Sequence, residues 1–264
     1  EDTLYLTVYH YWVYGSSYEE CLNYDFEHKT HEEKSEYMTF RLRLLYIEHL
    51  SNKHDKHLLF NKYETYQLFK DEYKRDVILC KSELDFGPFC EFVREHPVFV
   101  VKPTDMSGGR GVHKASVEGL NEQALQQFYR ALLEEGKTNQ EKFLAGQEQS
   151  VVLEELIDQD ERMAAFNPAS VNGIRLNTVR VNGKIHVYQP WFKVGCGGHF
   201  LTSAVFGTMD AGIDAKTGIV DTPGFKENGE RYEYHPDNHL PILGFQIPQW
   251  DELLDLAKNC AHRS

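Results

Sequence analysis

The residues with the clearest chemical potential lie between positions 98 and 112, where a lysine stands between an apolar run and a glycine-rich turn. Residues 98–101 are predicted to form a buried strand, and Pro103 after Lys102 prevents a helix from following. The next residues can surround an anion with backbone N–H groups: Ser107, Gly108, Gly109, Arg110 and Gly111. A strand resumes at Val112. This spacing is typical of a phosphate-binding hairpin, and equally of an ordinary hairpin with a flexible tip and a surface lysine.

A second group of candidate residues is a pair of adjacent carboxylates inside an apolar run. Residues 150–157 are predicted to form a strand that contains Glu154 and Glu155. A buried charge needs a partner, so a functional role is one interpretation of the pair. The other is simple alternation, in which one glutamate faces solvent.

Further cations stand at the ends of other predicted elements. Asn182-Gly183 predicts a type I′ turn between strands 174–181 and 184–192, which is the clearest hairpin in the sequence. Arg175 lies in the first of these strands, and Lys193 follows the second. Lys62 opens a short predicted helix at 62–69. Asp214 is interpreted as a turn residue.

Composition limits the classes of protein to be considered. The net charge of −13 argues against a general binder of nucleic acid, so an anionic ligand must be held by local cations. No apolar run reaches membrane-spanning length, and the N-terminus lacks a signal pattern. Five scattered cysteines without a Cys-x-x-Cys pair indicate neither a zinc site nor a disulfide framework. We therefore expect a cytoplasmic protein without membrane insertion.

The remaining pattern places these residues on a mixed set of elements. Residues 4–14 are aromatic and apolar and form either a strand or a buried helix, whereas residues 36–50 have the periodicity of an amphipathic helix. A strand is expected at 77–80 and a capping box at Ser82 and Asp85. Asn121 is expected to cap a helix that Gly136 ends, and Pro248 to open the final helix.

These elements predict an α+β fold with two mixed lobes built on antiparallel sheets, preceded by an aromatic-rich helical region. The expected boundaries are 1–60 for the N-terminal region, 61–146 for the first lobe and 147–264 for the second.

The order of a lysine, a strand with a glycine loop, a paired-glutamate strand and a cationic hairpin resembles the ATP-grasp superfamily, whose two lobes close on ATP. More narrowly, the chain resembles the sugar-transfer-associated ATP-grasp family. The narrower likeness rests on Asn-Pro-Ala-Ser-Val-Asn-Gly-Ile-Arg at 167–175, on Ala-Gly-Ile-Asp at 211–214 with Gly218, on His235-Pro236, and on Gly-Phe-Gln-Ile-Pro-Gln-Trp at 244–250. Two positions depart from it: Gly173 stands where a Thr is usual, and Thr202-Ser203 where an Asp-Asn pair is usual.

The resemblance implies a role for each candidate residue. Lys62 and Lys102 would contact the α- and β-phosphates, and Ser107, Gly108, Gly109, Arg110 and Gly111 would cover the β- and γ-phosphates. Glu154 would accept a hydrogen bond from the adenine amino group, with the backbone of Glu155 and Ile157 along the base edge. Glu161, or alternatively Asp160, would hold the ribose. Arg175 and Lys193 would neutralise the transferred phosphate, and Asn172 would orient substrate or phosphate.

The implied activity is that of an ATP-dependent ligase that activates a carboxylate as an acyl-phosphate for an amine or hydroxyl, in cell-surface polysaccharide biosynthesis. The implied cofactors are ATP and Mg²⁺. The implied partners are a small carboxylate, an amine or sugar acceptor, and glycan-biosynthesis enzymes. Two alternatives are a phosphotransferase acting on a sugar or alcohol, and a non-catalytic nucleotide-binding partner of glycosyltransferases. The family's magnesium ligands, an Asp followed by a Glu and an Asn, are expected beyond Ser264.

Overall fold

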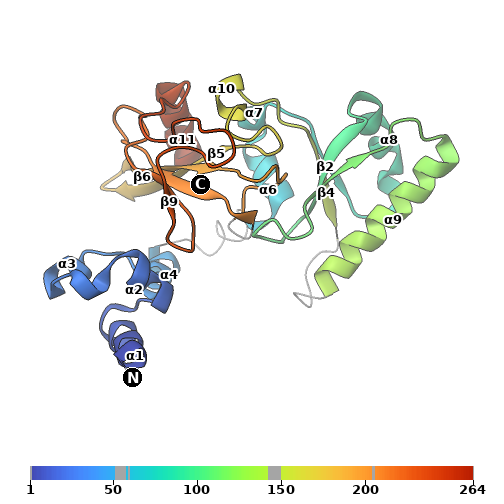
Figure 1. Cartoon of the computed structure of the whole chain (residues 1–264). Helices are drawn as coiled ribbons and strands as arrows, with labels where there is room; N and C mark the ends of the chain where they lie inside the picture. Colours follow the sequence, from blue (N-terminus) through green and yellow to red (C-terminus); the bar gives the residue numbers. More distant parts are fainter. Residues whose placement is uncertain (1, 51–57, 59, 142–149, 204–205, 264) are drawn as a thin grey trace. The chain divides into compact units, whose positions relative to one another are not determined.

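The computed structural model describes residues 2–50, 58, 60–141, 150–203 and 206–263, which form two compact units (Figure 1). The units comprise residues 1–57 and 58–264. No helix in these described ranges is long and apolar enough to cross a membrane.

The first unit is helical and is centred on one buried aromatic ring. Its elements are α1 (Asp2–Tyr14), α2 (Tyr18–Asn23), η1 (Phe26–His28), α3 (His31–Ser35) and α4 (Phe40–Leu50). Phe26 is fully buried, and its ring contacts those of His10, Tyr14, Tyr24 and Tyr37. Residues 4–14, for which the sequence left a strand or a buried helix open, lie in helix α1. The amphipathic helix expected at 36–50 begins only at Phe40.

Helix α4 does not bury the apolar face that its periodicity predicts. Phe40, Leu44 and Ile47 stay 50%, 47% and 41% exposed. A helical period thus identified the element but not its burial, because periodicity alone does not say what a face packs against.

The second unit begins with a four-stranded antiparallel sheet in the order β1-β4-β2-β3. Its strands are β1 (Val77–Cys80), β2 (Val98–Pro103), β3 (His113–Ser116) and β4 (Val151–Glu155). Its helices are α6 (Lys62–Leu68), α7 (Lys70–Tyr73), η2 (Glu83–Asp85), α8 (Phe86–Glu95) and α9 (Glu122–Glu141). The capping box of Ser82 and Asp85 is present. Helix α9 continues beyond Gly136, where the sequence predicts its end.

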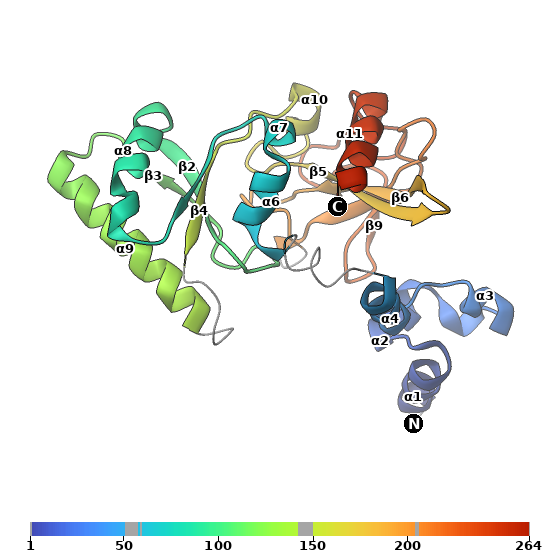
Figure 2. The same ribbon diagram turned by 180° about the vertical axis from the view of Figure 1, so that it is seen from behind.

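Helices cover the two faces of this sheet differently (Figures 1 and 2). Helices α8 and α9 pack Phe89 and Tyr129 against Phe99, Val101 and Leu153 of the strands. On the other face, Tyr66 of α6 packs against Val77 and Val152. Alternate residues of β4 therefore enter opposite cores, and the part of the second face that α6 leaves uncovered borders the candidate site.

A five-stranded antiparallel sheet follows in simple order from β5 to β9. Its strands are β5 (Gly173–Val181), β6 (Lys184–Val194), β7 (Met209–Gly212), β8 (Gly224–Phe225) and β9 (Arg231–Tyr232), with α10 (Glu161–Ala164) and α11 (Trp250–Arg263) beside them. Asn182 and Gly183 have φ of 50° and 77°, as the predicted type I′ turn requires. Helix α11 begins at Trp250, two residues after Pro248. The α+β fold with two antiparallel sheets is as predicted.

Strand β4 belongs to the first sheet, although the sequence assigns residues 147–264 to the second lobe. Val77 pairs with Glu154, and Val100 pairs with Glu154 on the other side, so β4 lies in the middle of the sheet. The passage from the first sheet to the second therefore follows Glu155.

Candidate functional site

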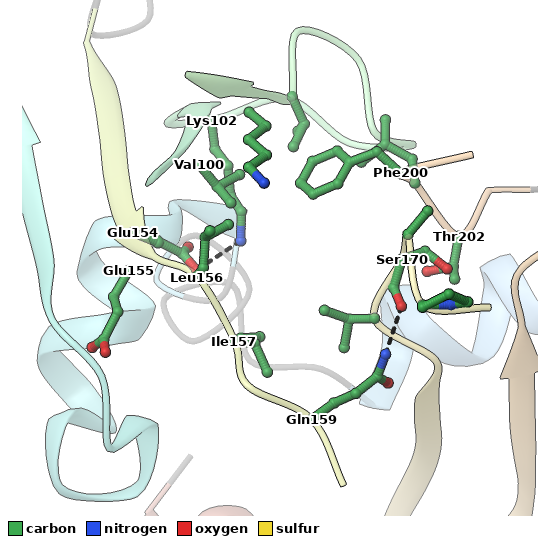
Figure 3. Close-up of a pocket in the computed structure, with 16 residues that line it drawn as sticks. Val100, Lys102, Glu154, Glu155, Leu156, Ile157, Gln159, Ser170, Phe200 and Thr202 are labelled. Carbon is green, nitrogen blue, oxygen red and sulfur yellow. Dashed lines mark hydrogen bonds and ion pairs between the residues drawn. The ribbon is translucent and has the colours of Figure 1, made fainter. Parts of the chain in front are cut away.

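A cavity of about 600 Å³ lies between the uncovered face of the first sheet and three segments of the second lobe (Figure 3). It is lined by Val100, Lys102, Val112, Lys114, Glu154, Glu155, Leu156, Ile157, Gln159, Pro168, Ala169, Ser170, Val171, Phe200, Leu201 and Thr202. Cavities of this size hold small ligands, and this one combines apolar walls with convergent charged groups.

Strand register explains why these charged groups converge. Val100 of β2 pairs with Lys114 of β3 on one side and with Glu154 of β4 on the other. Paired residues share a face of the sheet, so Lys114, Val100 and Glu154 form a row across it. Lys102 lies two residues after Val100 and faces the same way. Sequence reasoning singled out Lys102 and Glu154 but not Lys114, and the ligand contacts expected of the first two stay predictions.

Glu154 is the most buried charge of the site, with 4% of the residue exposed. Its Oε2 accepts hydrogen bonds from Lys102 Nζ at 2.7 Å and from Arg75 Nη2 at 2.9 Å and Nε at 3.2 Å. Burial opposes ionisation, but Lys102 and Arg75 hold the pKa of Glu154 below its ordinary value. No sequence motif indicated that Arg75 belongs beside Glu154. The one available signal was that a buried glutamate requires a partner.

Lys62 lies beside this pair but binds backbone carbonyls. Its Nζ donates to the carbonyls of Pro103 at 2.7 Å and Thr104 at 3.4 Å, and to that of Met106. Burial and the neighbouring Lys102 charge lower the pKa of Lys62 to about 8. Lys62 does not line the cavity; it holds the turn that leads from β2 into the glycine loop.

The glycine loop is a turn that requires its glycines. Gly108, Gly109 and Gly111 have φ of 70°, 75° and 68°, a conformation that is costly for other residues. Arg110 donates through its N–H and Nε to the Ser107 carbonyl, which closes the turn on itself. The five residues of the loop lie outside the lining of the cavity, whereas Val112 directly after them belongs to it.

The segment after β4 presents backbone groups to the cavity. Glu155 donates its N–H to the Asp76 carbonyl at 3.0 Å, so this N–H is used within the protein. Within the described residues, no hydrogen bond uses the N–H of Leu156 or Ile157, and both residues line the cavity. The Ile157 N–H can therefore make the base contact expected of it, and the backbone contact expected of Glu155 stays a prediction.

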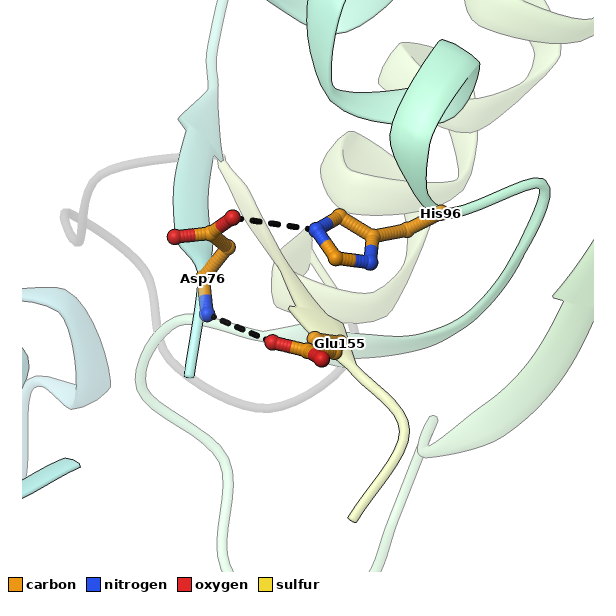
Figure 4. A group of neighbouring side chains, drawn as sticks. All are labelled: Asp76, His96 and Glu155. Atoms are coloured by element: carbon orange, nitrogen blue, oxygen red, sulfur yellow. Dashed lines mark hydrogen bonds and ion pairs between the residues drawn. The ribbon is translucent and has the colours of Figure 1, made fainter. Parts of the chain in front are cut away.

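The Glu155 side chain points away from the cavity (Figure 3) and anchors the strand ends on the other side (Figure 4). Its carboxylate accepts the Asp76 N–H at 3.0 Å, and Asp76 in turn contacts His96 Nε2 at 3.0 Å. The side-chain atoms of Asp76, His96 and Glu155 that could bind a metal ion lie within 4.8 Å of one another. The hydrogen bonds explain this grouping, which fixes residues 75–76 against 154–155. The two glutamates therefore point to opposite sides of the sheet, as strand alternation requires.

Asn172 holds a wall of the cavity in place. Its Nδ2 donates to the carbonyls of Met163 at 2.8 Å and Asn167 at 3.1 Å, and its Oδ1 accepts the Gly195 N–H at 2.9 Å. Gln159 joins the same wall through the Ser170 carbonyl and the Asn172 N–H. Both amide hydrogens of Asn172 are thus used within the protein. Its side chain thus fixes the segment 167–172, and the substrate or phosphate contact expected of Asn172 stays a prediction.

Three further predicted residues lie outside the cavity lining: Arg175, Lys193 and Glu161. The Arg175 guanidinium lies 5.7 Å from the centre of the Trp191 ring, and Lys193 Nζ donates to Asp210 Oδ1 at 3.0 Å. Glu161 is exposed at the start of α10, while Asp160 caps this helix and pairs with Arg162. The ligand contacts expected of Arg175, Lys193 and Glu161 stay predictions.

The cavity does not offer a set of oxygen ligands for magnesium. Glu154 and Glu155 are the only carboxylates in its lining among the described residues. The first is occupied by two cations, and the second points away. No described residue is assigned to the metal.

The second unit is thus an α+β arrangement with a ligand-sized cavity beside its first antiparallel sheet, and two lysines and two glutamates are the charged residues in the lining. A model of the family described as sugar-transfer associated ATP-grasp matches residues 41–264, and the chain belongs to this family. Its fold is therefore the ATP-grasp fold, as predicted.

Two solved structures are similar to the chain. D-alanyl-alanine synthetase A from Vibrio cholerae O1 biovar eltor str. N16961 has a TM-score of 0.34 and 10% identity over 76% of this chain and 65% of its own. D-alanine-D-alanine ligase from Helicobacter pylori has a TM-score of 0.32 and 13% identity over 78% of this chain and 60% of its own. The chain thus spans less than two thirds of either. A search of curated proteins found no match.

Proposed function

We propose that the cavity binds ATP and that the protein is an ATP-dependent ligase that activates a carboxylate for transfer to an amine or hydroxyl. The observation that carries the proposal is the Lys102–Glu154 pair, which faces the cavity directly before a segment with available backbone N–H groups. ATP has phosphates at one end, which a cation can bind, and an adenine amino group at the other, from which a carboxylate can accept a hydrogen bond.

In this proposal the adenine lies against residues 154–157. Glu154 accepts from the exocyclic amino group, the Ile157 N–H donates to the ring, and Glu161 holds the ribose. Lys102 turns to the phosphates, while the turn held by Lys62 brings the glycine loop over them. Phe200 and Leu201 line the cavity from the second lobe and exclude water from the reacting phosphate.

The proposed reaction has two steps. A carboxylate oxygen of the substrate attacks the γ-phosphorus, and the bond to the β,γ-bridging oxygen breaks, so that ADP leaves. The amine or hydroxyl of the acceptor then attacks the acyl carbon, loses its proton and releases inorganic phosphate. Arg175 and Lys193 are proposed to neutralise the transferred group, for which Lys193 must exchange Asp210 for phosphate. We place the acceptor among precursors of cell-surface polysaccharides, in line with the sugar-transfer association in the family's name.

Calorimetry with ADP and ATP, with and without magnesium, tests nucleotide binding directly. Substituting Lys102→Met should weaken ADP binding by roughly 10- to 100-fold, since a hydrogen bond to a charged group is lost. Arg94→Gln, at an exposed position of α8, is the matched control and should leave the affinity unchanged. Absence of ADP and ATP binding by the wild type under both conditions would refute the proposal.

A second candidate is a non-catalytic nucleotide-binding protein that assists glycosyltransferases. The lack of a free carboxylate pair in the described lining of the cavity favours it. It predicts nucleotide binding that magnesium leaves unchanged and no ADP release with any pair of carboxylate and acceptor. Product analysis distinguishes both from a phosphotransferase, which would yield a stable phosphate ester.

A further inference from the structure

Glu154 carries two cations on one oxygen atom, and only one of them faces the cavity. Lys102 Nζ and Arg75 Nη2 lie 2.7 Å and 2.9 Å from Glu154 Oε2. Lys102 belongs to the lining of the cavity, whereas Arg75 does not. An anionic ligand in the cavity therefore competes with Glu154 for Lys102 alone.

This competition has a cost that depends on Arg75. Only 6% of the Glu154 side chain is exposed, and a buried carboxylate without a partner is strongly unfavourable. If Lys102 leaves Glu154 for a phosphate, Arg75 is the cation that still contacts the carboxylate. With two cations available, one can be transferred while the glutamate stays paired.

Arg75 is held so that it cannot follow Lys102. Its guanidinium contacts Glu154 through both Nε and Nη2 and lies 4.3 Å from the centre of the Tyr73 ring. The next residue, Asp76, is bound to Glu155 through its N–H and to His96 through its carboxylate. The contacts of Asp76 and Tyr73 thus fix the backbone and the plane of the arginine.

We propose that Arg75 is a positioning residue that keeps Glu154 paired and aimed at the cavity while Lys102 exchanges this carboxylate for a ligand phosphate. The inference rests on the proposed nucleotide binding. It predicts that Arg75 matters for ligands that carry phosphate, and much less for those that do not.

Calorimetry with ADP and with adenosine tests this in the full chain. Adenosine leaves Lys102 on Glu154, but ADP requires the exchange. Arg75→Gln should therefore weaken ADP binding roughly tenfold and leave adenosine binding nearly unchanged. In a Glu154→Gln background no charge is left behind when Lys102 moves, so Arg75→Gln should then have no effect on ADP. Arg94→Gln serves again as the control.

The outcomes separate the inference from the proposed function. If the wild type binds neither ligand, the proposed function fails. If the wild type binds both, an equal loss of ADP and adenosine in Arg75→Gln, or a loss that persists with Glu154→Gln, overturns the positioning role and leaves a structural one. Thermal unfolding checks each variant. Should Arg75→Gln not fold, Arg75→Lys takes its place: it keeps a cation beside Glu154 but loses the two-point contact, so any loss should be less than about tenfold and confined to ADP. An equal loss of ADP and adenosine affinity in this variant refutes the inference.

Discussion

At the scale of single residues, Lys102 and Lys62 differ in what their ammonium groups contact. Lys102 pairs with the Glu154 carboxylate, whereas Lys62 donates to neutral carbonyls and stays near another cation. Burial, and after it the charge of Lys102, lower the pKa of Lys62, because both disfavour its charged form. This shift gives Lys62 a dependence on pH near neutrality.

We expect ADP affinity to fall as pH rises above about 8. Burial and Lys102 lower the pKa of Lys62 to about 8, so above this value Lys62 loses its charge and holds the turn before the glycine loop less firmly. Calorimetry at pH 7 and pH 9 measures the effect. Lys62→Met should bind ADP more weakly at pH 7 and depend less on pH. An unchanged pH dependence in that variant would contradict the assignment.

The lowered pKa of Lys62 also affects the stability of the fold, which should rise with pH where the ADP affinity falls. In the unfolded chain Lys62 keeps its ordinary pKa of 10.5, so between pH 8 and 10.5 the unfolded state binds more protons than the folded one. The contribution of Lys62 to the free energy of unfolding should therefore increase over this window. Urea unfolding of wild type and Lys62→Met across it tests the sign, and a decrease specific to the wild type would exclude it.

Sequence reasoning reached some residues of the site and not others for a definite reason. Lys102 and Glu154 are recognisable because each stands at the end of an apolar strand. Arg75 is 79 positions from Glu154, and the pairing of β1 with β4 brings them together. No local pattern encodes such a contact. Asn172 was singled out from the sequence, but its hydrogen-bond partners lie in segments whose positions cannot be predicted from periodicity.

At the scale of elements, the glycine loop is where backbone conformation and function can be separated. Gly108 and Gly119 both have left-handed φ, 70° and 73°, and an added Cβ would meet no atom within 4 Å at either position. The two sites differ in place: one lies in the glycine loop, and the other in the turn after β3. They form a matched pair for substitution.

Gly108→Ala and Gly119→Ala should each destabilise the fold by about 1 kcal/mol, since alanine is disfavoured at left-handed φ. Only Gly108→Ala should weaken ADP binding, because only this turn is proposed to cover the phosphates. Urea unfolding and calorimetry measure the two effects. Equal ADP affinities in both variants would exclude the loop from phosphate binding.

Residues 167–172, which form a wall of the cavity, pack so closely against Gly195 that a side chain has no room there. A Cβ there would lie 2.2 Å from Ser170 Oγ and 2.6 Å from Asn167 Nδ2. Gly195→Ala should destabilise the fold by roughly 1–3 kcal/mol, the usual cost of overpacking. Gly173→Ala, where no atom lies within 4 Å, should change the free energy of unfolding by less than about 0.5 kcal/mol. Similar values for the two variants would contradict the packing argument.

At the scale of the whole molecule, the cavity and the three hydrophobic core clusters belong to residues 58–264. The α+β class and the hairpin of β5 and β6 followed from the sequence because turns and apolar runs are local signals. The place of β4 in the first sheet did not follow from the sequence, since its neighbours β1 and β2 precede it by many residues. The boundary expected at 146 therefore preceded the observed one.

A chain limited to residues 58–264 should bind ADP with the affinity of the full chain, because every residue of the cavity lies in it. Calorimetry on the two proteins compares the affinities, and circular dichroism checks that the shorter one is folded. A folded shorter protein with clearly weaker ADP binding would show that residues 1–57 contribute to the site.

The central position of β4 also bears on how the protein is made. On the ribosome, β1 emerges long before β4, the strand beside which it lies at the edge of the first sheet. Until residue 155 has left the exit tunnel, the first sheet lacks its middle strand, and Arg75 has no glutamate to meet. By contrast, β5 and β6 are neighbours in sequence and can pair at once. Because distant contacts form slowly, completion of the first lobe should limit the rate of folding, and the nucleotide cavity should be among the last features to form.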